Sequence, residues 1–261
     1  AAYVKSRYGA TNENAQKAWE LMLETVYNDA GTRDLFLSAI RFPRLDYKKP
    51  PTFELDKISA AWKELQAAAP LFKELETYTY DLVSLGVHVL SLQCRETHEK
   101  MITAFENKNS KAFQKHSQEF KQIIIDLDKL AGSHQDYLLG SWLEDAKRWG
   151  TNESEKALFE WNARRVLTLW GETTMLRDYS RRSWSGMFSS FYLPRWTMFI
   201  DEMQKSLESG KTFNEAAVTE KLVQWELSWA EKRDIFPTKP NGQIINLSKN
   251  ILEKYFHSHA K

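Results

Sequence analysis

The sequence predicts an all-α protein: a single domain over residues 1–261, folded as an irregular bundle of about eight or nine helices with one long central helix. Three observations support this fold class. Apolar residues recur at three- and four-residue steps along most of the chain. Gly and Pro fall between those stretches. No segment alternates apolar and polar residues for more than a few positions, as a strand would.

The first half of the chain contains four such stretches. We expect helices at residues 13–28, 56–69, 71–107 and 110–130. Thr11 or Asn12 can cap the first helix, and Pro70 ends the second. Between them, residues 30–55 contain three prolines and are predicted to form a long irregular loop. The stretch 71–107 has no strong breaker and gives the central helix, about 50 Å long.

The second half follows the same pattern with clearer stops. We expect helices at residues 137–149, 151–170, 176–192, 196–207, 213–233 and 247–256. Glu155 lies three residues after Asn152, as in a capping box. Gly150 and Gly171 end two of the helices, and Pro194 separates two others.

Composition excludes several classes of function. Lys and Arg number 36 against 35 Asp and Glu, a net charge of +1 that disfavours a nucleic-acid partner. No run approaches the roughly 18 apolar residues of a transmembrane helix, so no membrane partner is expected. Cys94 is the single cysteine, which rules out an internal disulfide and a cysteine-based zinc site. Cys94 lies mid-helix among apolar residues and is expected in the core.

Patterns typical of catalysis or metal binding do not occur. None of the six His has a Glu three residues before it, and there is no HExxH, GxSxG, Walker or GxGxxG motif. Asp126 and Asp128 are two residues apart on one predicted helix, so their side chains diverge and are expected to be surface charges. We therefore expect no catalytic residue, no metal and no cofactor in this chain.

Tryptophan and arginine are concentrated in residues 142–196, which hold six of the ten Trp and seven of the thirteen Arg. Such a segment forms either a stiff core or the wall of a pocket for a polar ring such as a sugar. Trp on helix faces is usually core. However, Arg164 and Arg165 lie in a mostly apolar helix, Trp170 lies at a helix end, and residues 177–179 place polar groups just after the following loop. These details favour a pocket.

The segment also resembles a known family. Residues 162–171 (NARRVLTLWG), the pair Asp178-Tyr179 and residues 192–196 (YLPRW) are similar to the C-terminal helical domain of the α-N-acetylglucosaminidases. This glycoside hydrolase family includes the lysosomal enzyme of heparan sulfate degradation. Residues 6–9 (SRYG) and 138–144 (LLGSWLE) match in the same order, and the resemblance covers nearly the whole chain.

The resemblance implies a role for this chain as part of a larger glycoside hydrolase. Family members remove terminal α-linked N-acetylglucosamine with retention, using two Glu in an upstream (β/α)8 barrel. The implied partners are therefore that barrel and a glycan with terminal α-N-acetylglucosamine, and this segment alone is expected to be inactive. The positions that match the family's sugar pocket are Trp170, Leu176 and Tyr179. Supporting residues behind the pocket wall are expected to be Arg164, Asp178 and Arg195.

Two alternatives belong to other classes. One is a stand-alone helical carbohydrate-binding or interaction module without catalysis, and the other is an autonomous helical enzyme. The sequence departs from the lysosomal pattern at residues 172–175 (ETTM), which leaves the contacts of that loop open. The Lys-rich, Cys-poor composition favours a secreted, periplasmic or cell-surface bacterial protein over a lysosomal one.

Overall fold

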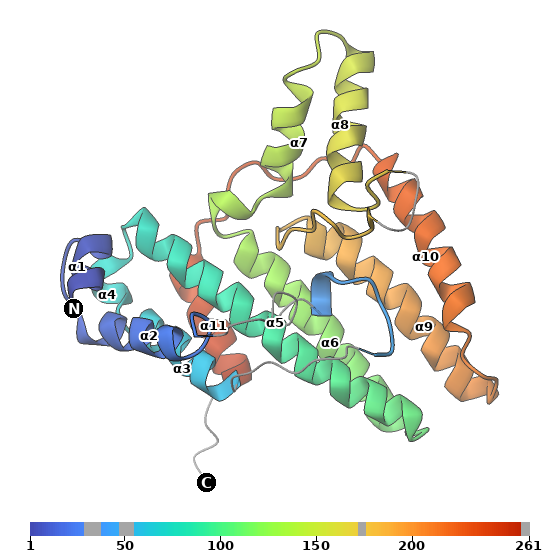
Figure 1. The fold of residues 1–261 in the computed structure, drawn as a ribbon, viewed down its shortest axis with the longest axis horizontal. Helices are drawn as coiled ribbons and strands as arrows, with labels where there is room; N and C mark the ends of the chain where they lie inside the picture. Colours follow the sequence, from blue (N-terminus) through green and yellow to red (C-terminus); the bar gives the residue numbers. More distant parts are fainter. Residues whose placement is uncertain (29–37, 47–54, 172–175, 257–261) are drawn as a thin grey trace.

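A computed structural model describes residues 1–28, 38–46, 55–171 and 176–256 (Figure 1). These residues contain eleven α-helices and no strand, which confirms the all-α prediction with slightly more helices than expected. Two of them are short: α1 (Ala2–Tyr8), which we did not predict, and α4 (Ala69–Phe72). Helix α5 (Glu76–Glu106) has 31 residues and is the predicted long central helix.

Helices α5 and α6 (Ser110–Ala131) form the central pair (Figure 1). Helices α1, α2 (Glu13–Glu24), α3 (Leu55–Ala67), α4 and α11 (Ile244–Phe256) gather around one end of this pair. Of the two predicted candidates, Asn12 caps α2, because its side-chain oxygen accepts a hydrogen bond from the backbone N–H of Ala15 at 2.9 Å. In α5, a Cβ on Gly86 would lie 2.4 Å from the Trp62 ring of α3, so this glycine permits the close approach of the two helices.

Helix α9 (Leu193–Ser209) packs beside α6, and α10 (Glu215–Ala230) packs against α9 on the side away from the central pair (Figure 1). Helices α7 (Leu139–Lys147) and α8 (Glu153–Leu167) form a hairpin that projects away from the rest of the molecule (Figure 1). Asn152 caps α8 through the backbone N–H of Glu155 at 3.0 Å. The Glu155 carboxylate returns to the backbone N–H of Thr151 at 2.7 Å, so the capping box is shifted by one residue.

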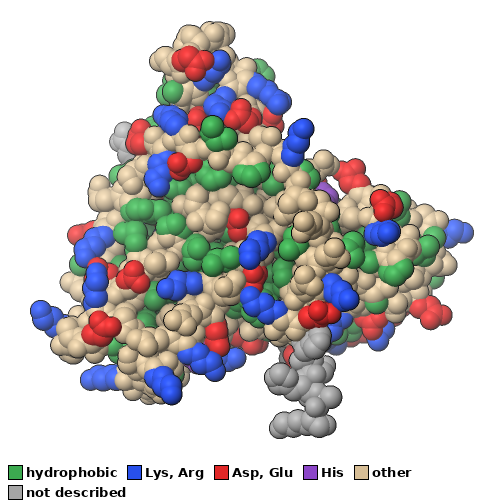
Figure 2. Space-filling view, turned by 180° about the vertical axis from the view of Figure 1, so that it is seen from behind, with side chains coloured by type: hydrophobic (Ala, Val, Ile, Leu, Met, Phe, Trp, Pro, Cys, Tyr) green, Lys and Arg blue, Asp and Glu red, His purple; other side chains and the backbone are tan. Residues whose placement is uncertain are grey.

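The core is one connected apolar cluster that all the larger helices share. Its largest side chains include Trp62, Trp196 and Trp229, all without exposed surface, and Cys94 is buried as predicted. On the surface, basic and acidic side chains are interspersed on the face shown in Figure 2, with no stripe of one sign. Within the described ranges, no helix is long and apolar enough to cross a membrane.

The prediction of a helix over residues 176–192 is wrong. Residues 176–187 form turns and isolated bridges, and only a π-helical turn at Phe188–Tyr192 precedes α9. Pro194 also differs from expectation, because it lies in the first turn of α9, where its missing N–H costs nothing. Pro70 begins α4 in the same way. Of the predicted loop over 30–55, residues 38–46 contain the short 3₁₀ helix η1 (Ser38–Ile40), and most of the remainder lies outside the described residues.

Candidate functional site

Three large side chains that the family resemblance assigned to a sugar pocket lie at the surface. Trp170, Leu176 and Tyr179 are 42%, 39% and 66% exposed, and we call them the aromatic platform. The rings of Trp170 and Tyr179 lie 5.3 Å apart at an interplanar angle of 47°. Large apolar groups held together in water indicate a surface that another molecule covers. The platform is therefore not part of the core.

Backbone contacts after α8 bring the platform residues together. Helix α8 ends at Leu167, and Thr168 follows it as the cap. Leu169 and Arg177 form an antiparallel bridge, and the N–H of Asp178 donates to the carbonyl of Thr168 at 2.9 Å. These contacts close the loop between Trp170 and Tyr179. Residues 172–175, whose contacts the sequence left open, lie outside the described residues.

A buried ionic cluster, formed by Arg195 and the carboxylates of Asp178 and Glu226, adjoins the platform through Asp178. Arg195 of α9 has no exposed surface, and its Nη1 donates to Asp178 at 2.8 Å and to Glu226 of α10 at 2.7 Å. Its Nη2 donates to the carbonyl of Ile40 at 3.1 Å. The guanidinium also lies 4.8 Å from the centre of the Phe191 ring. One side chain thus joins three segments, those of Ile40, α9 and α10, to Asp178, the residue that precedes Tyr179.

Burial and charge oppose each other in this cluster. Burial lowers the pKa of Arg195, but Asp178 and Glu226 outweigh it, so the pKa is raised overall and the guanidinium stays charged. Burial raises the pKa of Glu226, while Arg195 lowers it and Asp178 raises it further. A guanidinium between two carboxylates gives strong charge-assisted hydrogen bonds in fixed directions. The cluster can therefore hold Asp178 in one position.

Asp178 needs that support because its backbone is unfavourable. Its φ is 57°, in the left-handed region that side chains other than glycine rarely adopt. Asp and Asn tolerate this region better than other residues. The strained residue lies directly between Arg177, whose guanidinium is 3.4 Å from the centre of the Phe42 ring, and Tyr179 of the platform. The turn therefore directs the Arg177 side chain towards Phe42 and the Tyr179 side chain towards Trp170.

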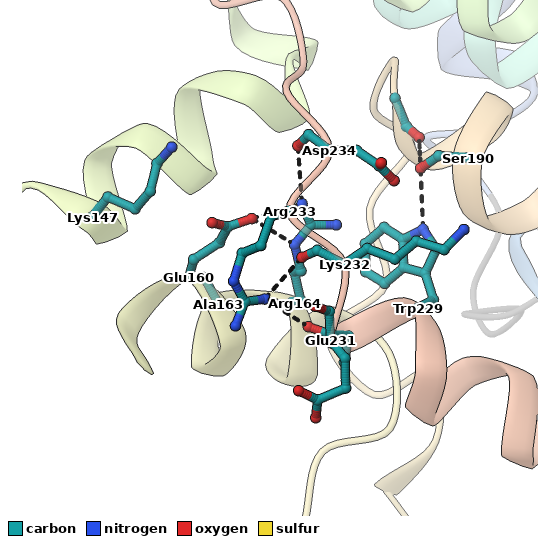
Figure 3. A network of polar contacts seen from close by, with 12 residues as sticks. Lys147, Glu160, Ala163, Arg164, Ser190, Trp229, Glu231, Lys232, Arg233 and Asp234 are labelled. Carbon is teal, nitrogen blue, oxygen red and sulfur yellow. Dashed lines mark hydrogen bonds and ion pairs between the residues drawn. The ribbon is translucent and has the colours of Figure 1, made fainter. Parts of the chain in front are cut away.

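Arg164 is buried and paired, as its apolar helix indicated, but in a separate network (Figure 3). Its guanidinium donates from Nη2 to Glu160 at 2.7 Å and to the carbonyl of Asp234 at 3.1 Å. It also lies 4.9 Å from the centre of the Trp229 ring. Arg164 thus fastens α8 to the chain after α10 and reaches the platform only through the backbone. The structure brings Asp178 and Arg195 together and places Arg164 apart from them.

The tryptophan-rich segment is mostly surface. Of its six Trp, only Trp196 is fully buried, whereas Trp149 at the end of the α7–α8 hairpin is 80% exposed. Trp142 and Trp161 are partly exposed, with their ring N–H groups bonded to the Ala163 carbonyl and the Glu231 carboxylate. Five of the six Trp of the segment therefore lie at least partly at the surface, whereas Phe188, Phe191, Tyr192 and Trp196 belong to the core.

Sequence reasoning missed Glu226 and misjudged Asp128. Glu226 is four residues from Leu222 and so lies on the apolar stripe of α10, a signal for a buried, paired carboxylate. Asp128 was expected to be a surface charge, but it accepts hydrogen bonds from the N–H groups of Gly186 at 2.8 Å and Ser189 at 3.0 Å. Asp126 is also buried and bonds Tyr255. Both carboxylates have structural partners.

Comparison with known proteins places the whole arrangement in a family. The model of the α-N-acetylglucosaminidase (NAGLU) C-terminal domain matches residues 1–254. The chain belongs to this family. The match confirms the resemblance that the sequence showed over nearly the whole chain.

Relatives of this NAGLU C-terminal domain are longer proteins. Human α-N-acetylglucosaminidase is 28% identical over 264 residues, which cover 98% of this chain and 36% of the human protein. Similar solved structures include CpGH89 from Clostridium perfringens in complex with its substrate GlcNAc-α-1,4-galactose, with TM-score 0.87, 26% identity, and 97% and 31% of the two chains covered. A family 89 glycoside hydrolase of the same organism with PUGNAc has TM-score 0.86 at the same identity and coverage. The chain thus spans about a third of these relatives.

Proposed function

We propose that this domain completes the pocket for terminal α-linked N-acetylglucosamine in a retaining exo-α-N-acetylglucosaminidase, packed against an upstream (β/α)8 barrel. The observation that carries the proposal is the aromatic platform, because Trp170 and Tyr179 are exposed together on a buried ionic framework. Family membership supports the activity, and the greater length of the relatives supports a catalytic part outside this chain.

The chemistry divides between two parts of such a protein. Retaining glycosidases break the bond with two carboxylates about 5 Å apart, which we assign to the barrel. The platform would hold the sugar: Trp170 offers a flat apolar face to the pyranose ring, and Leu176 an apolar wall. Tyr179 adds a hydroxyl that can donate to or accept from a sugar hydroxyl. Groups that orient the ring raise the rate without taking part in bond cleavage.

The side chains of the platform must be held rigidly for this role, because a side chain that is displaced from the sugar ring no longer stabilises the transition state. Arg195 and Asp178 fix the end of the loop that carries Tyr179, and the Thr168–Asp178 backbone bond fixes its beginning near Trp170. We infer that Arg164 supports the same wall from behind by anchoring α8, on which the loop starts.

Trp170→Ala in the protein that carries this domain together with its catalytic part tests the proposal. We expect kcat/KM for an α-N-acetylglucosaminide to fall ten-fold or more, about 1.4 kcal/mol of transition-state stabilisation. Folding should change little, because Trp170 is 42% exposed. Steady-state kinetics and urea unfolding measure the two quantities.

Trp149→Ala is the matched control, since Trp149 is 80% exposed on the distant hairpin tip. It should leave kcat/KM within about two-fold of the parent. Unchanged kinetics for Trp170→Ala, or an equal loss for both variants, would remove the platform from the sugar pocket.

A further inference from the structure

A further arginine holds the platform on the side of Trp170. Arg165 lies in the last turn of α8, and its Nε donates to the carbonyl of Leu169 at 2.8 Å. Its Nη2 donates to the carbonyl of Gly171. Leu169 and Gly171 are the two neighbours of Trp170 in the chain. One guanidinium therefore bonds the backbone on both sides of Trp170, and we call these two hydrogen bonds the Arg165 clamp.

Gly171 gives the loop the shape that the Arg165 clamp requires. Its φ is 84°, in the left-handed region that favours glycine. The chain turns there, so both carbonyls lie within reach of one planar guanidinium. A Cβ on Gly171 would lie 3.8 Å from Cδ1 of Leu176, so the turn also adjoins a second residue of the platform. The clamp thus acts on the part of the loop that presents Trp170.

The guanidinium of Arg165 is itself held by groups outside the loop. It lies 5.1 Å from the centre of the Trp161 ring, one turn earlier on α8, at a distance typical of cation–π contacts. The ring N–H of Trp161 donates to the carboxylate of Glu231 at 2.7 Å. Glu231 follows α10 directly. Contacts with α8 and with the end of α10 therefore place Arg165, which in turn fixes the backbone around Trp170.

Arg165 contacts a part of the platform loop that Arg164 and Arg195 do not reach. Arg195 bonds Asp178 at the other end of the loop. Arg164 is joined to the loop only through the backbone of α8. Within the described residues, Arg165 alone of the three bonds the neighbours of Trp170. Because Trp170 is 42% exposed, packing leaves part of its ring unrestrained, and the backbone conformation helps to select its rotamer.

We propose that Arg165 is the positioning residue of Trp170: the Arg165 clamp fixes the backbone on both sides of the ring and so holds the ring in one orientation. For its effect on the rate, this inference rests on the proposed function, in which Trp170 offers its face to the sugar. A ring that samples several orientations must be ordered by the sugar when it binds, which costs binding free energy. Removing the clamp should therefore weaken the contribution of Trp170 without removing its side chain.

Fluorine NMR of the 261-residue chain labelled with 5-fluorotryptophan tests the clamp without any substrate. Trp170→Phe identifies the Trp170 line by its loss. Arg165→Met removes both donors but keeps an unbranched stem that can pack on the Trp161 ring. We expect the Trp170 line to shift or to split in this variant, because the ring then samples more than one orientation. Arg148→Met, which removes the same group from an exposed residue of the α7–α8 hairpin, should leave the Trp170 line unchanged.

Kinetics of the protein that carries this domain together with its catalytic part test the consequence for the rate. Arg165→Met should lower kcat/KM for an α-N-acetylglucosaminide about five-fold. Arg165→Lys, which keeps the charge and one donor group, should lower it less. Both variants should stay folded, because Arg165 is only half-buried. In a Trp170→Ala background, Arg165→Met should change kcat/KM by less than about two-fold, because the two residues act through one contact.

Two results overturn the proposal. One is a Trp170 line that is the same in Arg165→Met and in the parent, and the other is a pair of losses in kcat/KM that add fully when Arg165→Met and Trp170→Ala are combined. Unchanged kinetics for Trp170→Ala contradict the proposed function instead, and the fluorine line still tests the clamp. Failure of the clamp and failure of the proposed function are thus distinguishable.

Discussion

Asp178 is a residue with two requirements that few side chains meet together. Its backbone has a φ of 57°, and its carboxylate accepts from Arg195 at 2.8 Å. A left-handed conformation costs roughly 1–2 kcal/mol for a residue with a Cβ. It persists only where the surroundings determine it. Here the buried ion pair with Arg195 holds Asp178 in this conformation.

Asp178→Asn separates the two requirements. Asn tolerates the same backbone but leaves Arg195 with one buried carboxylate in place of two. We expect the free energy of unfolding to fall by about 2–4 kcal/mol, measured by urea denaturation. Asp145→Asn, which breaks an exposed pair with Arg148, should cost less than about 1 kcal/mol. Equal losses for the two variants would contradict a supporting role for the buried pair.

The half-buried His88 and the buried His98 make stability depend on pH. Burial lowers the pKa of His88 and of His98 to about 4, from an unfolded value of 6.5. Between these values the unfolded chain binds more protons, so stability is complete above pH 6.5 and is lost as the pH falls towards 4. From pH 7.5 to 5, each histidine should cost about 2 kcal/mol. Urea unfolding of His98→Gln should show a loss between pH 7.5 and 5 that is about 2 kcal/mol smaller than that of the parent, and an unchanged pH dependence would exclude His98 as a source.

At the scale of elements, the segment 176–192 shows where periodicity fails. Its apolar spacing fits a helix, but distant groups hold its backbone in another shape. Asp128 of α6 accepts from the N–H groups of Gly186 and Ser189. Ser185 exchanges backbone hydrogen bonds with Tyr137 and Leu139. These partners are some 40 or more residues away in the sequence, so local spacing carries no sign of them.

Gly186→Ala tests whether this segment needs its left-handed glycine. Gly186 has φ 89°, and a Cβ there would lie 3.0 Å from both Leu139 and Phe236. We expect a loss of about 2–4 kcal/mol in unfolding free energy from strain and overpacking. Gly210→Ala is the matched control, because φ is 69° but nothing lies within 4 Å of the added Cβ. It should cost about 1 kcal/mol, and losses of the same size would show that packing around Gly186 is loose.

Elements that depend on local chemistry were predicted well. Asn12 and Asn152 cap the helices that the sequence assigned to them, because a cap is formed by residues two or three positions apart. The long α5 follows from a stretch without strong breakers. Pro70 and Pro194 were interpreted as breaks, whereas each lies in a first helical turn. A proline alone does not distinguish the end of one helix from the beginning of another.

At the scale of the whole molecule, the domain has its own core, but it contributes only the sugar-binding part of the proposed active site, because we assign the catalytic carboxylates to the barrel. Its buried side chains form one cluster, while the platform faces outward. The resemblance selected Trp170, Leu176 and Tyr179, and the structure shows all three exposed; their role in binding stays a prediction. Glu226 and Ile40 complete the framework from segments far from Arg195 in the sequence. The place of Glu226 on the apolar stripe of α10 indicates that it is buried, but no local motif reveals that Arg195 is its partner.

The 261-residue chain alone should not hydrolyse p-nitrophenyl α-N-acetylglucosaminide. We assign the acid and the nucleophile to the barrel, and relatives of this domain are about three times as long. Release of p-nitrophenol should stay at the rate of the buffer, while the protein that carries both parts turns the substrate over. Robust turnover by the isolated chain would contradict the division of labour proposed here.

The order of the segments that meet at Arg195 has a consequence for biosynthesis. The carbonyl of Ile40, the Asp178 carboxylate, the guanidinium and Glu226 leave the ribosome in that order. Until α10 has been translated, the buried cation lacks one counter-charge, and the turn at Asp178 lacks its full restraint. The surface formed by Trp170 and Tyr179 should thus acquire its final shape late, which makes the fluorescence of Trp170 a natural reporter of complete maturation.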